Sequence, residues 1–141
     1  MASVTARFLV DKSALARSTR PTVKARLAPI IESGLAATCG IVDLEVLYSV
    51  RNHAEHVSIR ERRALAYERA PITDATFDRA VEVQAILAVT GRHRIPIPDL
   101  LIAATAEASG LTVLHYDADF DLIASVTGQA SEWVVPRGTV P

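Results

Sequence analysis

The sequence predicts one α/β domain over residues 1–141, in which helices cover both faces of a mainly parallel sheet. Short, continuously apolar segments alternate with longer segments whose apolar residues recur at helical spacing. Continuous apolar runs are typical of strands buried on both faces of a parallel sheet, and their alternation with helices is typical of α/β folds. The length of 141 residues suits one domain, and an apolar share of 50% is enough to bury a core.

Four apolar segments are expected to form the strands of this sheet. They are residues 8–10, 36–39, 111–116 and 132–135. Asp11 directly follows the first segment, and Asp117 stands at the end of the third. Because the strands run in parallel, their carboxyl ends should meet at one edge of the sheet.

Seven segments are expected to form helices. They are residues 13–16, 21–33, 42–50, 54–69, 74–90, 100–108 and 120–126. Pro21 suits a first helical position and Gly34 a helix end, whereas Pro29 inside the same helix should kink it. Thr73 or Asp74 is the predicted N-cap of the fifth helix.

Two short segments are expected to lie outside helices. Ile95-Pro96-Ile97-Pro98 contains two prolines, so the following helix should begin at Asp99. Asp117-Ala118-Asp119 has the composition of a turn.

The charges are balanced in number but not in position. The chain has 15 basic and 16 acidic residues, a net charge of −1, which does not by itself indicate a nucleic-acid binder. Residues 1–30 carry six basic side chains against one acid, a net charge of +5, whereas residues 95–141 carry one basic side chain against six acids, a net charge of −5. The arginine-rich first part and the aspartate-rich last part must fold onto each other.

The composition also restricts the kinds of site and the location. A single cysteine, Cys39, excludes a disulfide within the chain and a cysteine-based zinc site. The longest apolar stretch, 100–106, is too short to span a bilayer, and residues 1–7 lack the pattern of a signal peptide. We therefore expect a cytoplasmic protein.

Four acids are predicted to converge at the carboxyl edge of the sheet. Asp11 and Asp117 end two strands, Glu45 lies soon after another, and Asp99 stands at a helix N-terminus. Carboxylates that converge without basic partners repel one another, so such a site needs a divalent cation, and oxygen ligands favour Mg²⁺ or Mn²⁺. Three of these acids also have a structural explanation: Asp99 as an N-cap, Asp117 in a turn and Glu45 as a solvated helix residue. Asp11 directly after a buried strand has no capping role that explains it well.

Other known site motifs match the sequence less well than a four-carboxylate metal site. Asp117-x-Asp119-x-Asp121 begins like a calcium loop but has Leu122 where the loop needs glycine and Gly128 where it needs glutamate. Asp43, Asp119 and Asp121 taken singly favour structural roles. The sequence contains no glycine-rich phosphate loop and no recognisable Ser-His-Asp arrangement.

Four blocks of sequence carry these acids and their neighbours. They are Phe8-Leu9-Val10-Asp11-Lys12-Ser13-Ala14-Leu15, Val42-Asp43-Leu44-Glu45-Val46-Leu47, Ile97-Pro98-Asp99-Leu100-Leu101-Ile102-Ala103-Ala104 and His115-Tyr116-Asp117-Ala118-Asp119-Phe120. In order and spacing they resemble a PIN domain, most closely the VapC ribonuclease toxins of type II toxin–antitoxin modules. This resemblance covers essentially the whole chain and implies a three-layer α/β/α fold.

The resemblance also implies a metal-dependent endoribonuclease that uses Mg²⁺, with Mn²⁺ as a possible substitute. It assigns catalysis to Asp11, Glu45, Asp99 and Asp117, metal binding to Asp11, Asp99 and Asp117, and auxiliary roles to Ser13 and Asp119. Lys12 stands where the family more commonly has threonine. Glu45 is expected to orient a water molecule or accept its proton.

The expected substrate is structured RNA such as tRNA or ribosomal RNA, whose cleavage inhibits translation. RNA phosphates need positive charge, and the candidates are Lys12, Arg17, Arg20, Arg92 and Arg94. The resemblance further implies a homodimer and a VapB-type antitoxin, for which helices 21–33 and 42–51 are candidate docking elements. Two alternatives stay open: a metal-dependent phosphoesterase acting on single-stranded DNA, and a catalytically silent PIN scaffold that only binds a partner.

Overall fold

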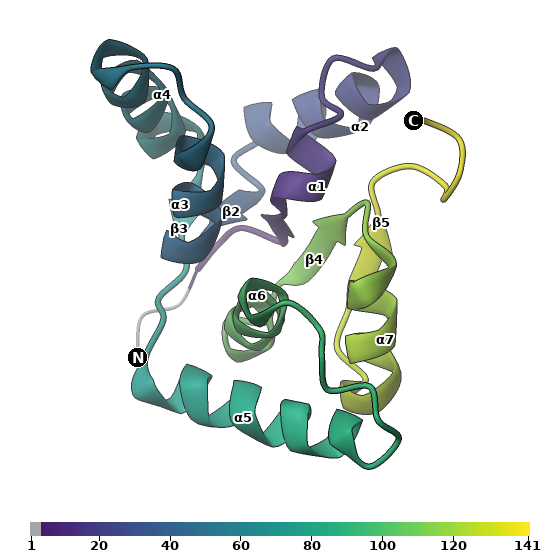
Figure 1. Ribbon diagram of the computed structural model, residues 1–141. Coiled ribbons are helices and arrows are strands. Elements are labelled where there is room, and N and C mark those ends of the chain that lie inside the picture. The colour runs from purple at the N-terminus through teal and green to yellow at the C-terminus, as the bar shows by residue number, and fades with distance from the viewer. Residues whose placement is uncertain (1–3) are drawn as a thin grey trace.

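The sheet has five strands in the computed structural model, which describes residues 4–141 (Figure 1). The strands are β1 (Phe8–Val10), β2 (Ala36–Thr38), β3 (Glu68–Arg69), β4 (Thr112–His115) and β5 (Ser131–Trp133). Their order is β3-β2-β1-β4-β5, and every pairing between neighbours is parallel. The prediction of a mainly parallel central sheet is thus confirmed. Residues 1–3 of the segment that lacks a signal-peptide pattern lie outside the described part.

Seven helices connect and cover the strands within residues 4–141. They are α1 (Lys12–Leu15), α2 (Pro21–Glu32), α3 (Gly40–Tyr48), α4 (His53–Ala66), α5 (Asp74–Ala88), α6 (Ile97–Ala108) and α7 (Ala118–Thr127). Thr73 is the N-cap of α5, and α2 continues past Pro29 to Glu32. Among the described residues, no helix is long and apolar enough to cross a membrane.

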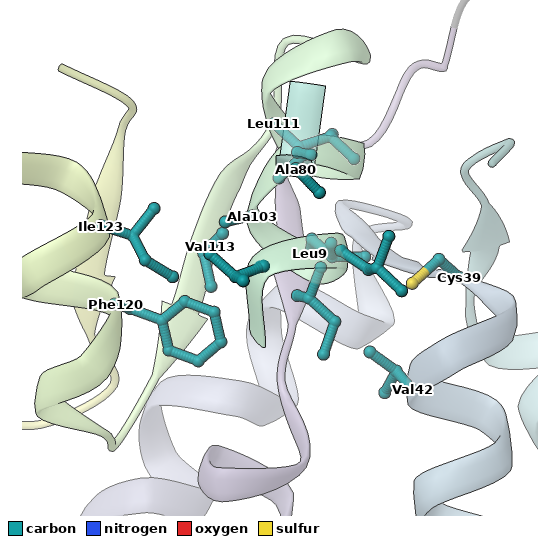
Figure 2. Close-up of a cluster of buried hydrophobic side chains, with 14 of the residues drawn as sticks. Leu9, Cys39, Val42, Ala80, Ala103, Leu111, Val113, Phe120 and Ile123 are labelled. Atoms are coloured by element: carbon teal, nitrogen blue, oxygen red, sulfur yellow. The ribbon is translucent and has the colours of Figure 1, made fainter. Parts of the chain in front are cut away.

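Alternating strand residues divide the core into two layers. Leu9 of β1 and Val113 of β4 lie in the larger cluster, which also contains Phe120 and Ile123 of α7 and Ala103 of α6 (Figure 2). The next residue of β1, Val10, points to the opposite face and packs in the cluster that includes residues of α1 and α2. Because successive strand side chains face opposite sides, both faces of the sheet are buried. The predicted three-layer α/β/α architecture is therefore confirmed.

The structure corrects the predicted helix over residues 54–69 at its end. The helix α4 stops at Ala66, and Glu68 and Arg69 form the edge strand β3, which pairs with β2. The carboxylate of Glu68 accepts hydrogen bonds from the backbone N–H groups of Thr5 and Ala6, at 2.9 and 3.0 Å. Pairing with a distant segment has overridden the local helical preference.

Two helix starts also differ from the prediction. Ile97 and Pro98 were expected outside the helix but form the first turn of α6, because the first N–H groups of a helix have no partner within it and a proline there loses nothing. Asp99 thus lies within the first turn, not at the N-cap. The expected turn at 117–119 is the start of α7, with Asp117 as its N-cap.

A largely buried ion pair fixes α4 against α3 and β2. Asp43 Oδ1 accepts hydrogen bonds from Thr38 Oγ1 at 2.8 Å and from Arg63 Nη2 at 3.1 Å. Arg63 is buried, and its guanidinium lies 4.5 Å from the centre of the Tyr67 ring. The contacts therefore give Asp43 the structural role that the sequence favoured.

We expect Asp43→Ala to lower the free energy of unfolding by about 3 kcal/mol, because it leaves the buried charge of Arg63 unpaired. Urea unfolding followed by circular dichroism measures the change. The matched control is Asp78→Ala on the exposed side of α5, where the change should stay within about 0.5 kcal/mol. Equal stabilities of the two variants would contradict the structural role of Asp43.

Candidate active site

Two aspartates follow neighbouring strands and are held in the same way. Asp11 comes after β1 and N-caps α1, with Oδ2 accepting the Ser13 N–H at 2.9 Å. Asp117 comes after β4 and N-caps α7, with Oδ1 accepting the Asp119 N–H at 2.9 Å. The backbone N–H of Asp11 donates to the carbonyl oxygen of Leu114 at 2.9 Å, so the two strand ends lie side by side. The expected convergence at the carboxyl edge is thus what the structure shows.

Three carboxylates come close enough to share one cation. Oxygen atoms of Asp99, Asp117 and Asp119 all lie within 4.8 Å of one another. Asp99 projects from the first turn of α6 and is only 8% exposed. Of the three predicted metal ligands, Asp99 and Asp117 lie in this group and Asp11 does not. Its third member is Asp119, for which the family resemblance implies an auxiliary role.

Burial, together with the charges of the neighbouring acids, sets the electrostatics of Asp99. Burial, followed by the charges of Asp11, Asp117, Asp119 and Glu45, raises the pKa of Asp99 from 3.8 to about 8. The N-terminus of α6 favours an anion by only about 0.3–1 kcal/mol, too little to offset a shift of this size. The other three predicted acids and Asp119 thus all act electrostatically on Asp99.

Glu45 faces the same site from α3 and is incompletely satisfied. Burial and the charge of Asp11 raise its pKa, whereas the ammonium of Lys12 lowers it. Its Oε1 atom is buried and has no hydrogen-bond partner among residues 4–141. A buried carboxylate oxygen without a partner and a set of oxygen-only donors both fit a hard divalent cation.

Ser13 joins the two strand ends. Its Oγ donates a hydrogen bond to Asp11 Oδ2 at 2.6 Å and accepts one from the backbone N–H of Tyr116 at 2.8 Å. The hydroxyl therefore fixes one oxygen of Asp11 and leaves the other available. This contact supports the auxiliary role predicted for Ser13.

His115 is a positioning residue that the sequence did not reveal. Its Nδ1 accepts the backbone N–H of Asp117 at 3.1 Å, and its Nε2 lies 2.8 Å from Ser131 Oγ. Accepting at Nδ1 places the proton of the neutral ring on Nε2. Burial lowers the pKa of His115, which keeps the ring neutral. The one signal in the sequence was a histidine at the end of a buried strand, two residues before Asp117.

We expect Ser13→Ala to lower the rate of the predicted RNA cleavage by about tenfold or more, because Asp11 loses one of its two hydrogen bonds from Ser13 and the Tyr116 N–H loses its acceptor. Initial rates at saturating and limiting substrate separate an effect on kcat from one on KM. Ser18→Ala, at an exposed serine just after α1, is the control. A Ser13→Ala rate within twofold of the Ser18→Ala rate would show that the hydroxyl does not position Asp11.

The predicted RNA-binding residues are dispersed around this site. Lys12 follows Asp11 directly, and Arg17 borders the groove next to Asp117. Arg20 is exposed before α2, and Arg92 and Arg94 are exposed in the segment that leads into α6. The structure thus brings Lys12 and Arg17 near the acids, while contacts of all five residues with RNA stay a prediction.

Comparison with known proteins extends these observations. Residues 8–126 match the PIN domain family. Ribonuclease VapC21 of Mycobacterium tuberculosis is 47% identical over 137 residues, which cover 96% of this chain and 99% of that protein. Ribonuclease VapC51 of Mycobacterium tuberculosis is 45% identical over 134 residues, which cover 95% and 97%.

Solved structures share the fold at lower identity. DNA-bound VapBC from Salmonella typhimurium superposes with a TM-score of 0.76 and 17% identity, covering 93% of this chain and 100% of that chain. VapBC-1 from nontypeable Haemophilus influenzae gives a TM-score of 0.73 at 13% identity, covering 90% and 97%.

Proposed function

The chain belongs to the PIN domain family, and from this premise we propose that it is the ribonuclease toxin of a toxin–antitoxin module. It would act in the cytoplasm as a Mg²⁺-dependent endoribonuclease on structured RNA, such as tRNA or ribosomal RNA, and so inhibit translation. The whole chain, residues 1–141, would form the single PIN domain. Two relatives that are named as ribonucleases support the reaction class, because both are at least 45% identical over at least 95% of this chain.

One observation carries the proposal of metal dependence. Asp99, Asp117 and Asp119 converge within 4.8 Å, and burial together with the charges of the neighbouring acids raises the pKa of Asp99 to about 8. Such a cluster is favourable only when a cation or protons neutralise it. A set of carboxylate oxygens favours Mg²⁺ or Mn²⁺.

The roles of the residues follow from their geometry. Asp99, Asp117 and Asp119 would hold the cation, with the free oxygen of Asp11 beside them. When bound, the cation would supply the positive charge that acidifies water and offsets the charge of the attacked phosphate. Glu45 would take a proton from the attacking water at Oε1, the buried atom without a partner. The water oxygen then forms a bond to phosphorus as the bond to the leaving ribose oxygen breaks.

A cleavage assay tests the proposed function. Purified protein is incubated with structured RNA or with single-stranded DNA in Mg²⁺, in Mn²⁺ or in EDTA. We expect RNA to be cut with either cation and to stay intact in EDTA. Cleavage in EDTA would contradict the metal mechanism, and cutting of DNA alone would identify the phosphoesterase alternative. No cutting in any lane would favour the silent scaffold, which the presence of all four acids argues against.

A groove between α3 and α4 supports the proposal of an antitoxin partner. It has a volume of about 710 Å³ and is lined by apolar side chains, including Leu44, Leu47 and Tyr67, together with Arg60 and Arg69. An amphipathic antitoxin segment with acidic residues matches this lining. The groove agrees with the expectation for helix 42–51. Adding a VapB-type antitoxin to the cleavage assay should therefore suppress the reaction.

The homodimer remains a proposal that one surface supports. Phe77 and Val81 of α5 and Ile97 of α6 are at least half exposed and line the same shallow hollow of about 180 Å³. Exposed apolar side chains gathered in this way are typical of protein interfaces. A second copy of the chain is the proposed occupant.

A further inference from the structure

A groove runs from the acidic site to the C-terminal tail. It has a volume of about 550 Å³, and Ser13 and Asp117 line the end that opens on the carboxylates. Arg17, Tyr116, Trp133 and Arg137 line the rest. None of the proposed catalytic roles uses the last three of these side chains. A molecule bound at Asp117 would extend along this groove.

The tail that forms one wall of the groove is fixed by Tyr116. The hydroxyl of Tyr116 accepts the Gly138 N–H at 2.8 Å and donates to the carbonyl oxygen of Val140 at 2.9 Å. Arg17 Nε donates to the carbonyl oxygen of Pro141 at 3.0 Å. In Figure 1 the tail leaves β5 and passes toward α1 and α2. The groove is therefore a built feature with a defined wall.

Two neighbouring aromatic rings lie between two guanidinium groups along this groove. The rings of Tyr116 and Trp133 meet edge to face, with centres 5.1 Å apart. The guanidinium of Arg17 lies 4.4 Å from the centre of the Tyr116 ring, and that of Arg137 lies 5.6 Å from the centre of the Trp133 ring. Nε1 of Trp133 donates to the Asp121 carboxylate at 3.0 Å, which fixes the indole.

This arrangement has the two components of a single-stranded nucleic-acid site. Aromatic rings bind nucleobases by stacking, and arginines bind the phosphates between them. Arg137 is exposed, so its side chain can move from the Trp133 ring and leave a flat surface the size of a base. Arg17 uses two of its five N–H groups in hydrogen bonds to the carbonyl oxygens of Ser13 and Pro141, which leaves donors for a phosphate.

We propose that this groove binds an unpaired nucleotide of the RNA next to the cleaved phosphate, with its base stacked on Trp133. Arg137 and Arg17 hold the neighbouring phosphates. The inference rests on the proposed ribonuclease function, whose substrate it specifies further: the cut would lie in a loop or other single-stranded stretch of a structured RNA, because a paired base is not free to stack on a side chain.

The fluorescence of Trp133 provides a direct test, because the chain has one tryptophan. Asp99→Asn protein in EDTA is titrated with a ten-nucleotide single-stranded RNA, and a gel checks that the RNA stays intact. We expect saturable quenching of the fluorescence. Adding Arg137→Ala should raise the Kd about tenfold, whereas adding Arg7→Ala, at an exposed arginine on the opposite edge of the sheet, should change it less than twofold.

Substitutions of Trp133 separate stacking from packing. Binding is then followed by the anisotropy of labelled RNA, and we expect Trp133→Leu to raise the Kd about tenfold and Trp133→Phe to restore most of the affinity. If Trp133→Leu fails to fold, the fluorescence titration and the Kd of Arg137→Ala still test whether a base stacks on Trp133. RNA that binds by anisotropy without quenching Trp133, or equal Kd values for Arg137→Ala and Arg7→Ala, would overturn the proposal.

The two proposals fail in different ways. Absence of RNA cleavage by the wild-type chain in Mg²⁺ would contradict the proposed function. The proposed function would stand if Arg137→Ala cleaved RNA with an unchanged KM and RNA did not quench the fluorescence of Trp133. That result would contradict the proposal that the groove binds an unpaired nucleotide.

Discussion

Asp99→Asn is expected to reduce RNA cleavage by roughly a thousandfold or more while the protein stays folded. Asp99 lies at the centre of the cluster, where the charges of four other acids act on it. Asparagine keeps the size of the side chain but removes one negative charge and one cation ligand. The remaining acids would then bind the cation more weakly, and the charge of the attacked phosphate would be less well offset.

Initial rates of cleavage in Mg²⁺ measure this effect, and circular dichroism shows that the variant is folded. The matched control is Asp78→Asn, at an exposed aspartate of α5, which should cut at the wild-type rate. If Asp99→Asn cleaved RNA within tenfold of that control, the cation would not depend on Asp99. The proposed assignment of the site would then be wrong.

The sequence predicted most of the fold because its strands are continuously apolar. Leu9 and Val113 are buried on one face and Val10 on the other, which is the pattern that indicated a sheet covered on both sides. The strand β3 escaped prediction because it consists of Glu68 and Arg69, two polar residues at the end of a helical pattern. Its existence depends on pairing with β2, which no local signal records.

The candidate site was predictable where it depends on chain topology and not where it depends on side-chain packing. Asp11 and Asp117 end two parallel strands, so their place at the same edge of the sheet followed from the predicted parallel arrangement, whereas the pairing of β1 with β4 comes from the structure. The contact of His115 Nδ1 with the Asp117 N–H depends on a ring orientation within the core. The position of Arg137 over the Trp133 ring depends on a tail that the Tyr116 hydroxyl fixes, and the sequence does not specify the course of that tail.

The second large effect concerns stability in the absence of a cation. Folded protein holds a proton on Asp99 up to about pH 8, whereas the unfolded chain releases it near pH 3.8. Between these values the folded state binds more protons than the unfolded state, so the contribution of Asp99 to the free energy of unfolding falls as the pH rises. The loss is on the order of 5 kcal/mol by pH 8. Burial also raises the pKa of Glu45 and of Asp119, which adds to the loss in the same direction.

Comparison with Asp99→Asn isolates this contribution from other titrating groups. In EDTA, urea unfolding at pH 4, 6 and 8 should show similar stability of the two proteins at pH 4 and a growing advantage of the variant toward pH 8. Added Mg²⁺ should raise the stability of the wild type at pH 8, because a cation that binds only the folded state stabilises it, and should affect the variant much less. A stability difference that stays constant from pH 4 to pH 8 would contradict a protonated, charge-crowded Asp99. Confirmation would mean that the acids needed for catalysis destabilise the empty site, so that the fold and the reaction depend on the same cation.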